Sequence, residues 1–170
     1  MSSICLIDTS VFTNLLNVTG RNQNRAEVIT AFKEYTELGC KFILPVATIF
    51  ETGNHIAQNG DGRLRRATAQ RFIAEVKAAF DGSAPWSPAE MPTEREWLLW
   101  LDDFPRRAGE NKSPDKLNEG TSWGDLTIIK EFDKCCTRFP MSEIFVWSLD
   151  GDLQQCHYRP YFNQAHGSPS

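Results

Sequence analysis

Two aspartates that each follow an apolar run are the residues of this chain best placed to do chemistry. The run Ile4-Cys5-Leu6-Ile7 leads directly into Asp8, and the run from Ile144 to Leu149 leads into Asp150. Each run is short, apolar and followed by polar residues, which is typical of a buried strand. In an open parallel sheet, the carboxyl ends of the strands meet at one edge, where ligands bind. Two carboxylates at that edge repel each other unless a cation joins them, so the pair predicts a divalent-metal site.

Glu51 and Asp125 extend this pair to four acids, and Asp152 is a candidate fifth. Asp125 opens a helical stripe whose other members are apolar: Ile129, Phe132 and Cys136. An acid at the head of such a stripe is expected to face the sheet rather than solvent. Buried acids need partners, and the local segments supply no Arg or Lys. Mg²⁺ or Mn²⁺, which prefer carboxylate and water ligands, are therefore the expected partners.

Each of these acids also has a purely structural interpretation. Asp8 can cap a helix that follows the first strand, and Asp150, which precedes a glycine, can belong to an ordinary turn. The other two acids lie three residues after a Ser or Thr, the spacing of a capping box: Glu51 and Asp125. Their common position near strand ends and on an apolar stripe favours the metal site.

Composition limits the class of protein. With 170 residues, 41% of them hydrophobic, the chain suits one domain with a substantial core. A net charge of -4 excludes a broadly basic nucleic-acid binder, but an acidic cleft that holds metal can still bind phosphates if basic residues surround it. No stretch approaches the roughly 20 apolar residues that span a bilayer, and the first residues lack a signal-peptide pattern, so no membrane partner is expected.

Cysteine usage indicates a reducing compartment. The five cysteines are odd in number and lack CxxC spacing, so a cytoplasmic protein with free thiols is expected. A zinc site formed by Cys156 and His157 with Cys135 or Cys136 is an alternative that the spacing does not favour.

Strand-like and helical segments alternate along the chain. This order predicts an α/β fold, a three-layer α/β/α sandwich with a mainly parallel central sheet. Helices are expected over 9–16, 22–39, 46–58, 63–80, from 93 onward and over 121–138, strands at 4–8, 41–44 and 144–150, an extended segment within 84–92, and an exposed loop over 105–120. We assign residues 1–157 to one domain and residues 158–170 to a polar C-terminal tail.

Four short motifs in this order resemble the PIN-domain family of metal-dependent nucleases, which includes VapC-type toxin ribonucleases. They are Leu6-Ile7-Asp8-Thr9-Ser10, Glu51 in a helix after the second strand, Trp123-Gly124-Asp125-Leu126-Thr127-Ile128-Ile129, and Val146-Trp147-Ser148-Leu149-Asp150-Gly151-Asp152-Leu153. Ser148 stands where the family pattern has Thr, and Leu153 where it usually has Phe. The resemblance extends from Ile4 to Cys156, but the segment from Gly82 to Gly120 is longer than in compact toxin members. It implies a PIN-like nuclease domain.

The resemblance also implies an activity and roles for these residues. The expected enzyme is a metal-dependent endoribonuclease in which one or two Mg²⁺ or Mn²⁺ ions activate water, leaving 5′-phosphate and 3′-hydroxyl ends. Asp8, Asp125 and Asp150 would be the main ligands, and Glu51 would bind a second ion or orient the water. Asp152 could share that role or take the place of Asp150 as a ligand. Hydroxyl groups would hold these carboxylates or a phosphate oxygen: Thr9, Ser10 and Ser148. Besides RNA, the partners to test are an antitoxin protein and a second copy of the chain.

Contacts to RNA are harder to place. Two basic groups could neutralise phosphates, one on the long helix and one in the loop: Arg63, Arg65, Arg66 and Arg71, and Arg106, Arg107 and Lys112. Ordinary solvated surface is the alternative for both groups. Four tryptophans could stack on bases: Trp86, Trp97, Trp100 and Trp123. The helical spacing of Trp97 and Trp100 favours packing instead, and His55 is expected at the rim of the site.

Three other interpretations compete with a nuclease. A silent PIN-fold protein could bind RNA or a partner without cleaving, although the complete acidic set argues against it. A phosphohydrolase of the haloacid dehalogenase kind needs an Asp two residues after its nucleophile, where this chain has Ser10. A receiver domain needs a Lys after a late strand, and none stands there in the expected junction.

Overall fold

A five-stranded sheet forms the centre of the molecule in the computed structural model, which describes residues 2–160. In spatial order its strands are β3 (Trp86–Pro88), β2 (Lys41–Leu44), β1 (Ser3–Ile7), β4 (Glu143–Trp147) and β5 (His157–Tyr158). All neighbours pair in parallel except β5, which runs antiparallel to β4. Strand β1, which precedes Asp8, therefore lies in the middle of the sheet.

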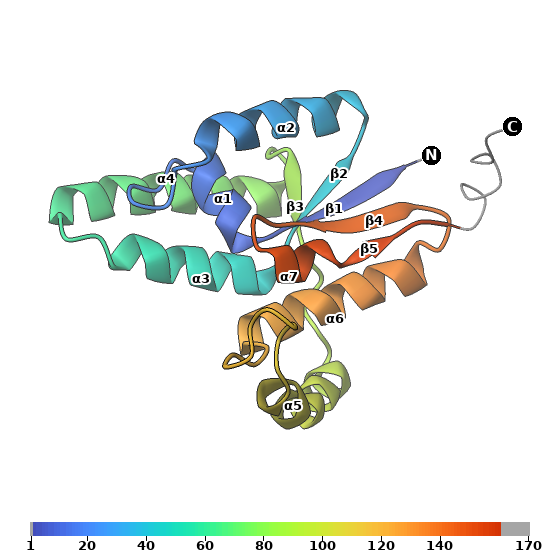
Figure 1. The fold of residues 1–170 in the computed structure, drawn as a ribbon. Helices are drawn as coiled ribbons and strands as arrows, with labels where there is room; N and C mark the ends of the chain where they lie inside the picture. Colours follow the sequence, from blue (N-terminus) through green and yellow to red (C-terminus); the bar gives the residue numbers. More distant parts are fainter. Residues whose placement is uncertain (1, 161–170) are drawn as a thin grey trace, which may run out of the picture.

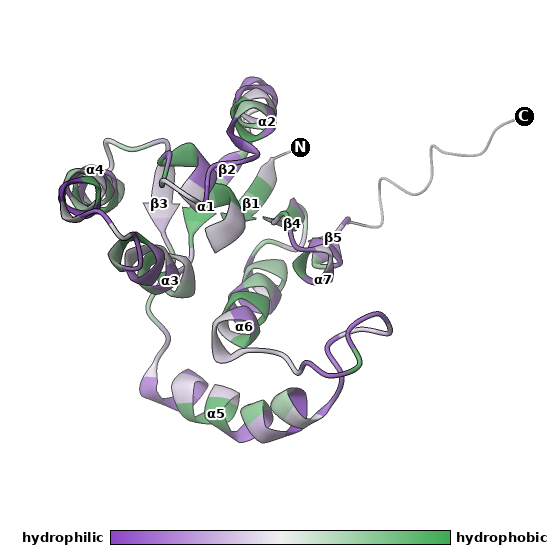
Figure 2. Ribbon diagram, turned by 60° about the vertical axis from the view of Figure 1, so that its left-hand side comes forward, coloured by the Kyte–Doolittle hydropathy of each residue, from purple (hydrophilic) through white to green (hydrophobic). Residues whose placement is uncertain are grey.

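Helices cover both faces of this sheet, which confirms the three-layer α/β/α sandwich. The helices are α1 (Thr9–Leu15), α2 (Arg25–Glu37), α3 (Val46–Ala57), α4 (Gly62–Asp81), α5 (Glu94–Gly109), α6 (Trp123–Arg138) and α7 (Gly151–Gln154). Figure 1 shows α2 on one side of the sheet and α6 on the other. Helix α5 lies outside the layers, packed against α6 (Figures 1 and 2).

Strand β1 carries a continuous apolar run because both of its faces are buried, as is usual for parallel sheets. Cys5 and Ile7 belong to the hydrophobic cluster shared with α1, α2 and α4, whereas Ile4 and Leu6 belong to the cluster under α6 and α7. This alternation follows from the two-residue period of a strand. The end of β1 therefore lies between these two hydrophobic clusters.

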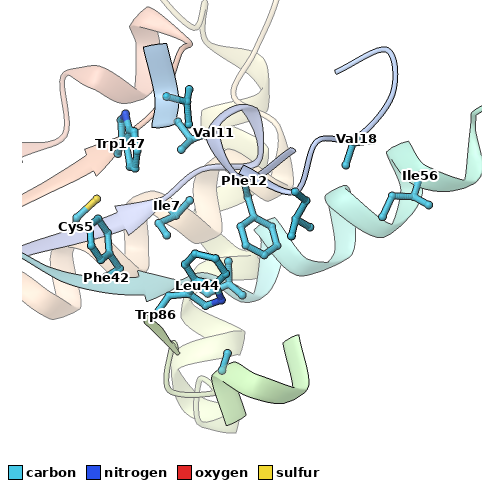
Figure 3. Close-up of a cluster of buried hydrophobic side chains, with 13 residues drawn as sticks. Cys5, Ile7, Val11, Phe12, Val18, Phe42, Leu44, Ile56, Trp86 and Trp147 are labelled. Carbon is cyan, nitrogen blue, oxygen red and sulfur yellow. The ribbon is translucent and has the colours of Figure 1, made fainter. Parts of the chain in front are cut away.

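An aromatic core holds α1 against the sheet. The ring of Phe12 on α1 meets Trp86 edge to face, with 5.5 Å between centroids, and Figure 3 shows Phe12 pointing toward Trp86 and Leu44. Trp147 at the end of β4 joins the same cluster. Burial of these large side chains fixes the first turn of α1, and with it the residues that directly follow β1.

The loop predicted over 105–120 is wrong in its first part, because α5 continues through Pro105 to Gly109. Proline removes one backbone N–H, so the helix passes this point with one hydrogen bond fewer. Arg106 pairs with Asp103 one turn earlier and with Glu110 one turn later. At the other end of α5, Thr93 and Glu96 form a capping box with both of its hydrogen bonds.

Tyr158 pairs with β4, so the sheet reaches one residue past the predicted domain end, and residues 161–170 of the predicted tail lie outside the described residues. All five cysteines carry free thiols. Within residues 2–160, no helix has both the length and the apolar character needed to cross a bilayer.

Candidate functional site

Asp8 lies where the ends of β1 and β4 come together. Its backbone N–H donates to the carbonyl of Trp147 over 3.0 Å, which ties the two strand ends. Its side-chain Oδ2 accepts from Ser10 Oγ at 2.6 Å and from Ser148 Oγ at 2.8 Å, and it caps α1 through the N–H of Ser10. All three bonds go to Oδ2, and Oδ1 accepts no hydrogen bond from the described residues. The capping interpretation is thus correct, and it leaves one oxygen of this buried carboxylate for another ligand.

Glu51 on α3 reaches the same edge of the sheet. Its Oε2 accepts a 2.7 Å bond from Thr9, and its Oε1 lies against Gly124, where a Cβ atom would come within 2.0 Å. Burial raises the pKa of Glu51, and the negative charges of Asp125 and Asp8 raise it further. The capping box predicted with Thr48 is wrong, because the Thr48 hydroxyl donates to the Ile7 carbonyl. Glu51 therefore serves the acidic cluster and not the start of its helix.

The remaining acids lie in the first turns of α6 and α7. Ser122 caps α6 by accepting from the N–H of Asp125, whose side chain is only 16% exposed. Asp150 caps α7 by accepting from the N–H of Asp152, and its own N–H donates to Ser148 Oγ at 2.9 Å. One serine hydroxyl therefore contacts both Asp8 and Asp150. The structure brings all five acids named from the sequence to one edge of the sheet.

Two lysines enter this cluster from the loop between α5 and α6, which corrects the expectation that no Lys or Arg is at hand. Lys112 Nζ lies 2.6 Å from Asp125 Oδ2, 3.5 Å from Asp152 Oδ2 and 3.6 Å from Asp150 Oδ2. Lys116 Nζ lies 2.7 Å from Asp152 Oδ2 and 3.2 Å from Asp150 Oδ1. Burial opposes the charge of Lys112, but the bond to Asp125 and the neighbouring carboxylates raise the pKa of Lys112 above its ordinary value.

The donor set fits a hard divalent cation. Carboxylate oxygens are the ligands that Mg²⁺ and Mn²⁺ prefer, and three carboxylates here already share one ammonium group. As the side chains lie, no three Asp, Glu, His or Cys residues within 2–160 are spaced around a single point as a bound ion requires. Lys112 and Lys116 instead lie against three of the acids: Asp125, Asp150 and Asp152.

Most of the basic residues considered for RNA binding have other partners. Arg106 and Arg107 pair with Asp103 on α5, and Arg71 donates to the carbonyls of Leu16 and Asn17. The start of α4 is different, because three exposed arginines gather there: Arg63, Arg65 and Arg66. Arg65 also donates to the Asn59 carbonyl.

Three of the four tryptophans lie close to the site. Trp86 is buried in the core, so its predicted role in base stacking is wrong. Trp97, Trp100 and Trp123 line an apolar cavity of about 420 Å³ between α3, α5 and α6, and Glu51 and Gly124 also line it. Trp123 packs edge to face on Trp97 at 5.3 Å between centroids. His55 does not line this cavity, and its Nδ1 lies 3.4 Å from Oε1 of Gln58.

Glu131 is a further acid that the sequence did not reveal. It lies on α6, is 5% exposed, and has no hydrogen-bond partner for Oε2 within the described residues. Burial raises the pKa of Glu131 to about 7, while a bond from the backbone of Val46 opposes that shift. Its position among Ile128, Thr127 and other buried residues of α6 gave no sign of chemistry in the sequence pattern.

Comparison with known proteins supports the fold. No family model matches the chain, and no curated protein matches its sequence significantly. A solved structure described as FitAcB from Neisseria gonorrhoeae matches with a TM-score of 0.54 and 16% identity, covering 89% of this chain and 91% of that chain. At this identity the likeness concerns the arrangement of sheet and helices, which extends over nearly the whole of both chains.

Proposed function

We propose that this protein is a metal-dependent endoribonuclease of the PIN kind. The observation that carries the proposal is the set of five carboxylates, Asp8, Glu51, Asp125, Asp150 and Asp152, at the carboxyl edge of a parallel sheet. Like charges at such an edge are costly unless a cation offsets them. The order of motifs along the chain and the likeness in fold support the same conclusion.

We assign different roles to the five acids according to their surroundings. Asp8, Asp125 and Asp150 would hold Mg²⁺ or Mn²⁺, and Glu51 and Asp152 would hold a second ion or orient water. When bound, such an ion supplies a nucleophilic water at neutral pH and stabilises charge on the phosphoryl oxygens. Ser10 and Ser148 fix the Asp8 carboxylate by hydrogen bonds, and Thr9 fixes Glu51. These hydroxyl groups keep the acids in place without adding charge.

Glu51 is suited to handling a proton. Its pKa is raised by burial and by the neighbouring carboxylates, so it accepts a proton from water more readily than an ordinary exposed Glu. Its carboxylate lies between Thr9 and the start of α6, beside Asp125. We assign it the role of orienting and deprotonating the attacking water.

Partners follow from the resemblance and from the exposed surface of α5. Leu98 and Leu99 are more than half exposed on this helix, beside the partly exposed Trp97. Apolar groups gathered on one helix suit a protein partner. We propose that the protein acts as the toxin of a toxin–antitoxin pair, and that an antitoxin or a second copy covers this surface.

Cleavage of RNA tests the proposal. Wild-type protein with Mn²⁺ is expected to cleave labelled RNA, and the Asp8→Asn variant is expected to lose at least about 100-fold in rate, the scale of removing one major electrostatic contact in an active site. Asp102→Asn, an exposed acid on α5, is the matched control and should retain wild-type activity. Equal cleavage by wild type and Asp8→Asn would refute the catalytic role. RNA binding without any cleavage would favour the silent PIN-fold alternative.

A further inference from the structure

The segment 110–121, which we name the lysine loop, has a defined shape that presents Lys112 and Lys116. At its base, the N–H of Thr121 donates to the Arg107 carbonyl over 3.1 Å. Gly120 lies so close to Ala108 that a Cβ atom would come within 2.0 Å of its backbone oxygen. Across the loop, the N–H of Lys112 donates to the Glu119 carbonyl at 2.7 Å.

The tip of the lysine loop is closed as well. Ser113 and Lys116 form a bridge, with the N–H of Lys116 donating to the Ser113 carbonyl over 3.0 Å. This turn directs both lysine side chains to the same acids. The side chain of Lys112 is only 10% exposed, which is unusual for lysine and requires paired charges around it.

The two ammonium groups occupy carboxylate oxygens of three of the five proposed metal ligands: Asp125, Asp150 and Asp152. Lys112 Nζ is 2.6 Å from Asp125 Oδ2 and Lys116 Nζ is 2.7 Å from Asp152 Oδ2. Both groups also lie within 3.6 Å of an oxygen of Asp150. An ion with ligand distances of about 2.1 Å cannot share these oxygens at their centre with an ammonium group, because the two cations repel and overlap.

We propose that Lys112 and Lys116 are an internal substitute for the divalent cation, so that metal binding must displace the lysine loop. The inference rests on the proposed function, since it concerns the same acids. Two positive charges offset the repulsion among Asp125, Asp150 and Asp152 while no ion is bound. The same charges lower the apparent affinity of the site for metal, because binding must first break these ion pairs. The enzyme is thereby self-inhibited at low metal concentration.

Calorimetric titration with Mn²⁺ tests this competition directly. The Lys112→Met/Lys116→Met double variant keeps the apolar stems without the charges and is expected to bind Mn²⁺ at least about tenfold more tightly than wild type. Lys112→Arg/Lys116→Arg retains the charges and should not show this gain. Lys33→Met/Lys77→Met removes two exposed lysines on α2 and α4 as a matched control for net charge. If the double Met variant does not fold, Lys116→Met alone should still bind several-fold more tightly.

The possible outcomes separate the inference from the proposed function. Equal or weaker Mn²⁺ binding by the Met variant would overturn the competition and leave a metal-binding site in place. Absence of Mn²⁺ binding in every variant would overturn the metal-dependent function together with the competition.

Tryptic cleavage gives a second readout that does not depend on activity. In wild-type protein, Mn²⁺ is expected to accelerate cleavage after Lys112 and Lys116 several-fold, because both leave the acidic cluster. Cleavage after Lys77 on α4 should not change and serves as the internal control. Unchanged or slower cleavage of the lysine loop at saturating Mn²⁺ would contradict displacement.

Discussion

At the scale of single residues, the contact between Glu51 and Gly124 explains why a glycine stands in the first turn of α6. A Cβ atom on residue 124 would meet Glu51 Oε1 at 2.0 Å and its Cδ at 3.1 Å. The backbone conformation of Gly124 is helical, so the requirement is one of space and not of backbone freedom. The motif Trp123-Gly124-Asp125 thus supplies Asp125 as a candidate metal ligand and leaves, at Gly124, the space that Glu51 occupies.

Gly124→Ala is expected to impair catalysis more than stability. The added methyl group displaces the flexible end of Glu51 from Thr9 and Asp125, and the helix itself gains from alanine. Cleavage of RNA with Mn²⁺ should fall at least about tenfold, the scale of a misplaced catalytic group. The free energy of unfolding, measured by thermal denaturation, should change by less than about 1 kcal/mol. Gly60→Ala, where a Cβ atom meets nothing within 4 Å, is the control. Wild-type activity in Gly124→Ala would show that Glu51 is dispensable.

At the scale of elements, the start of α6 determines where Asp125 lies. Ser122 accepts from the N–H of Asp125 at 3.1 Å, and α6 then runs through 16 residues packed on the sheet and on α5. Ser122→Ala removes this cap and is expected to lower the free energy of unfolding by about 1 kcal/mol. Ser122→Thr keeps a hydroxyl and should recover most of the loss in a denaturant titration. Equal stability of Ser122→Ala and wild type would show that the cap contributes nothing.

The elements also show what the sequence could reveal and what it could not. The strands before Asp8 and Asp150 and the helix carrying Asp125 were predictable, because unbroken apolar runs and a helical stripe are local signals. The end of α5 was not, since Pro105 and the polar residues after it are typical of a loop, whereas the helix continues to Gly109. The lysine loop has no periodicity, so the contact of Lys112 with Asp125 arises only from tertiary structure. Lys112 was considered for phosphate binding, but its partners in the structure are carboxylates.

At the scale of the whole molecule, stability should depend on pH through Glu131. Burial raises the pKa of Glu131 to about 7 in the folded protein, above the ordinary glutamate value of 4.5. The folded state therefore binds the proton more tightly than the unfolded chain. The contribution of Glu131 to the free energy of unfolding is greatest below about pH 4.5. It decreases as the pH rises toward about 7 and is constant above that. The loss amounts to about 3 kcal/mol, since each pKa unit corresponds to 1.36 kcal/mol.

Glu131→Gln tests this dependence. Because the amide carries no charge at any pH, the variant is expected to be more stable than wild type at pH 8 and similar to it near pH 4.5. Denaturant unfolding at both pH values measures the difference. Glu75→Gln on the partly exposed face of α4 is a control that should leave the pH profile unchanged. A profile for Glu131→Gln parallel to that of wild type would show that Glu131 is not the group responsible.

The whole fold brings five carboxylates to one edge of the sheet, and one loop places two lysines against three of them: Asp125, Asp150 and Asp152. A crystal structure of the protein soaked in Mn²⁺ is the most direct test of that account. We expect a Mn²⁺ ion bound by Asp8, Asp125 and Asp150, with Lys112 moved away from Asp125. Lys112 still bound to Asp125 at saturating Mn²⁺, with no ion in contact with these three carboxylates, would contradict it.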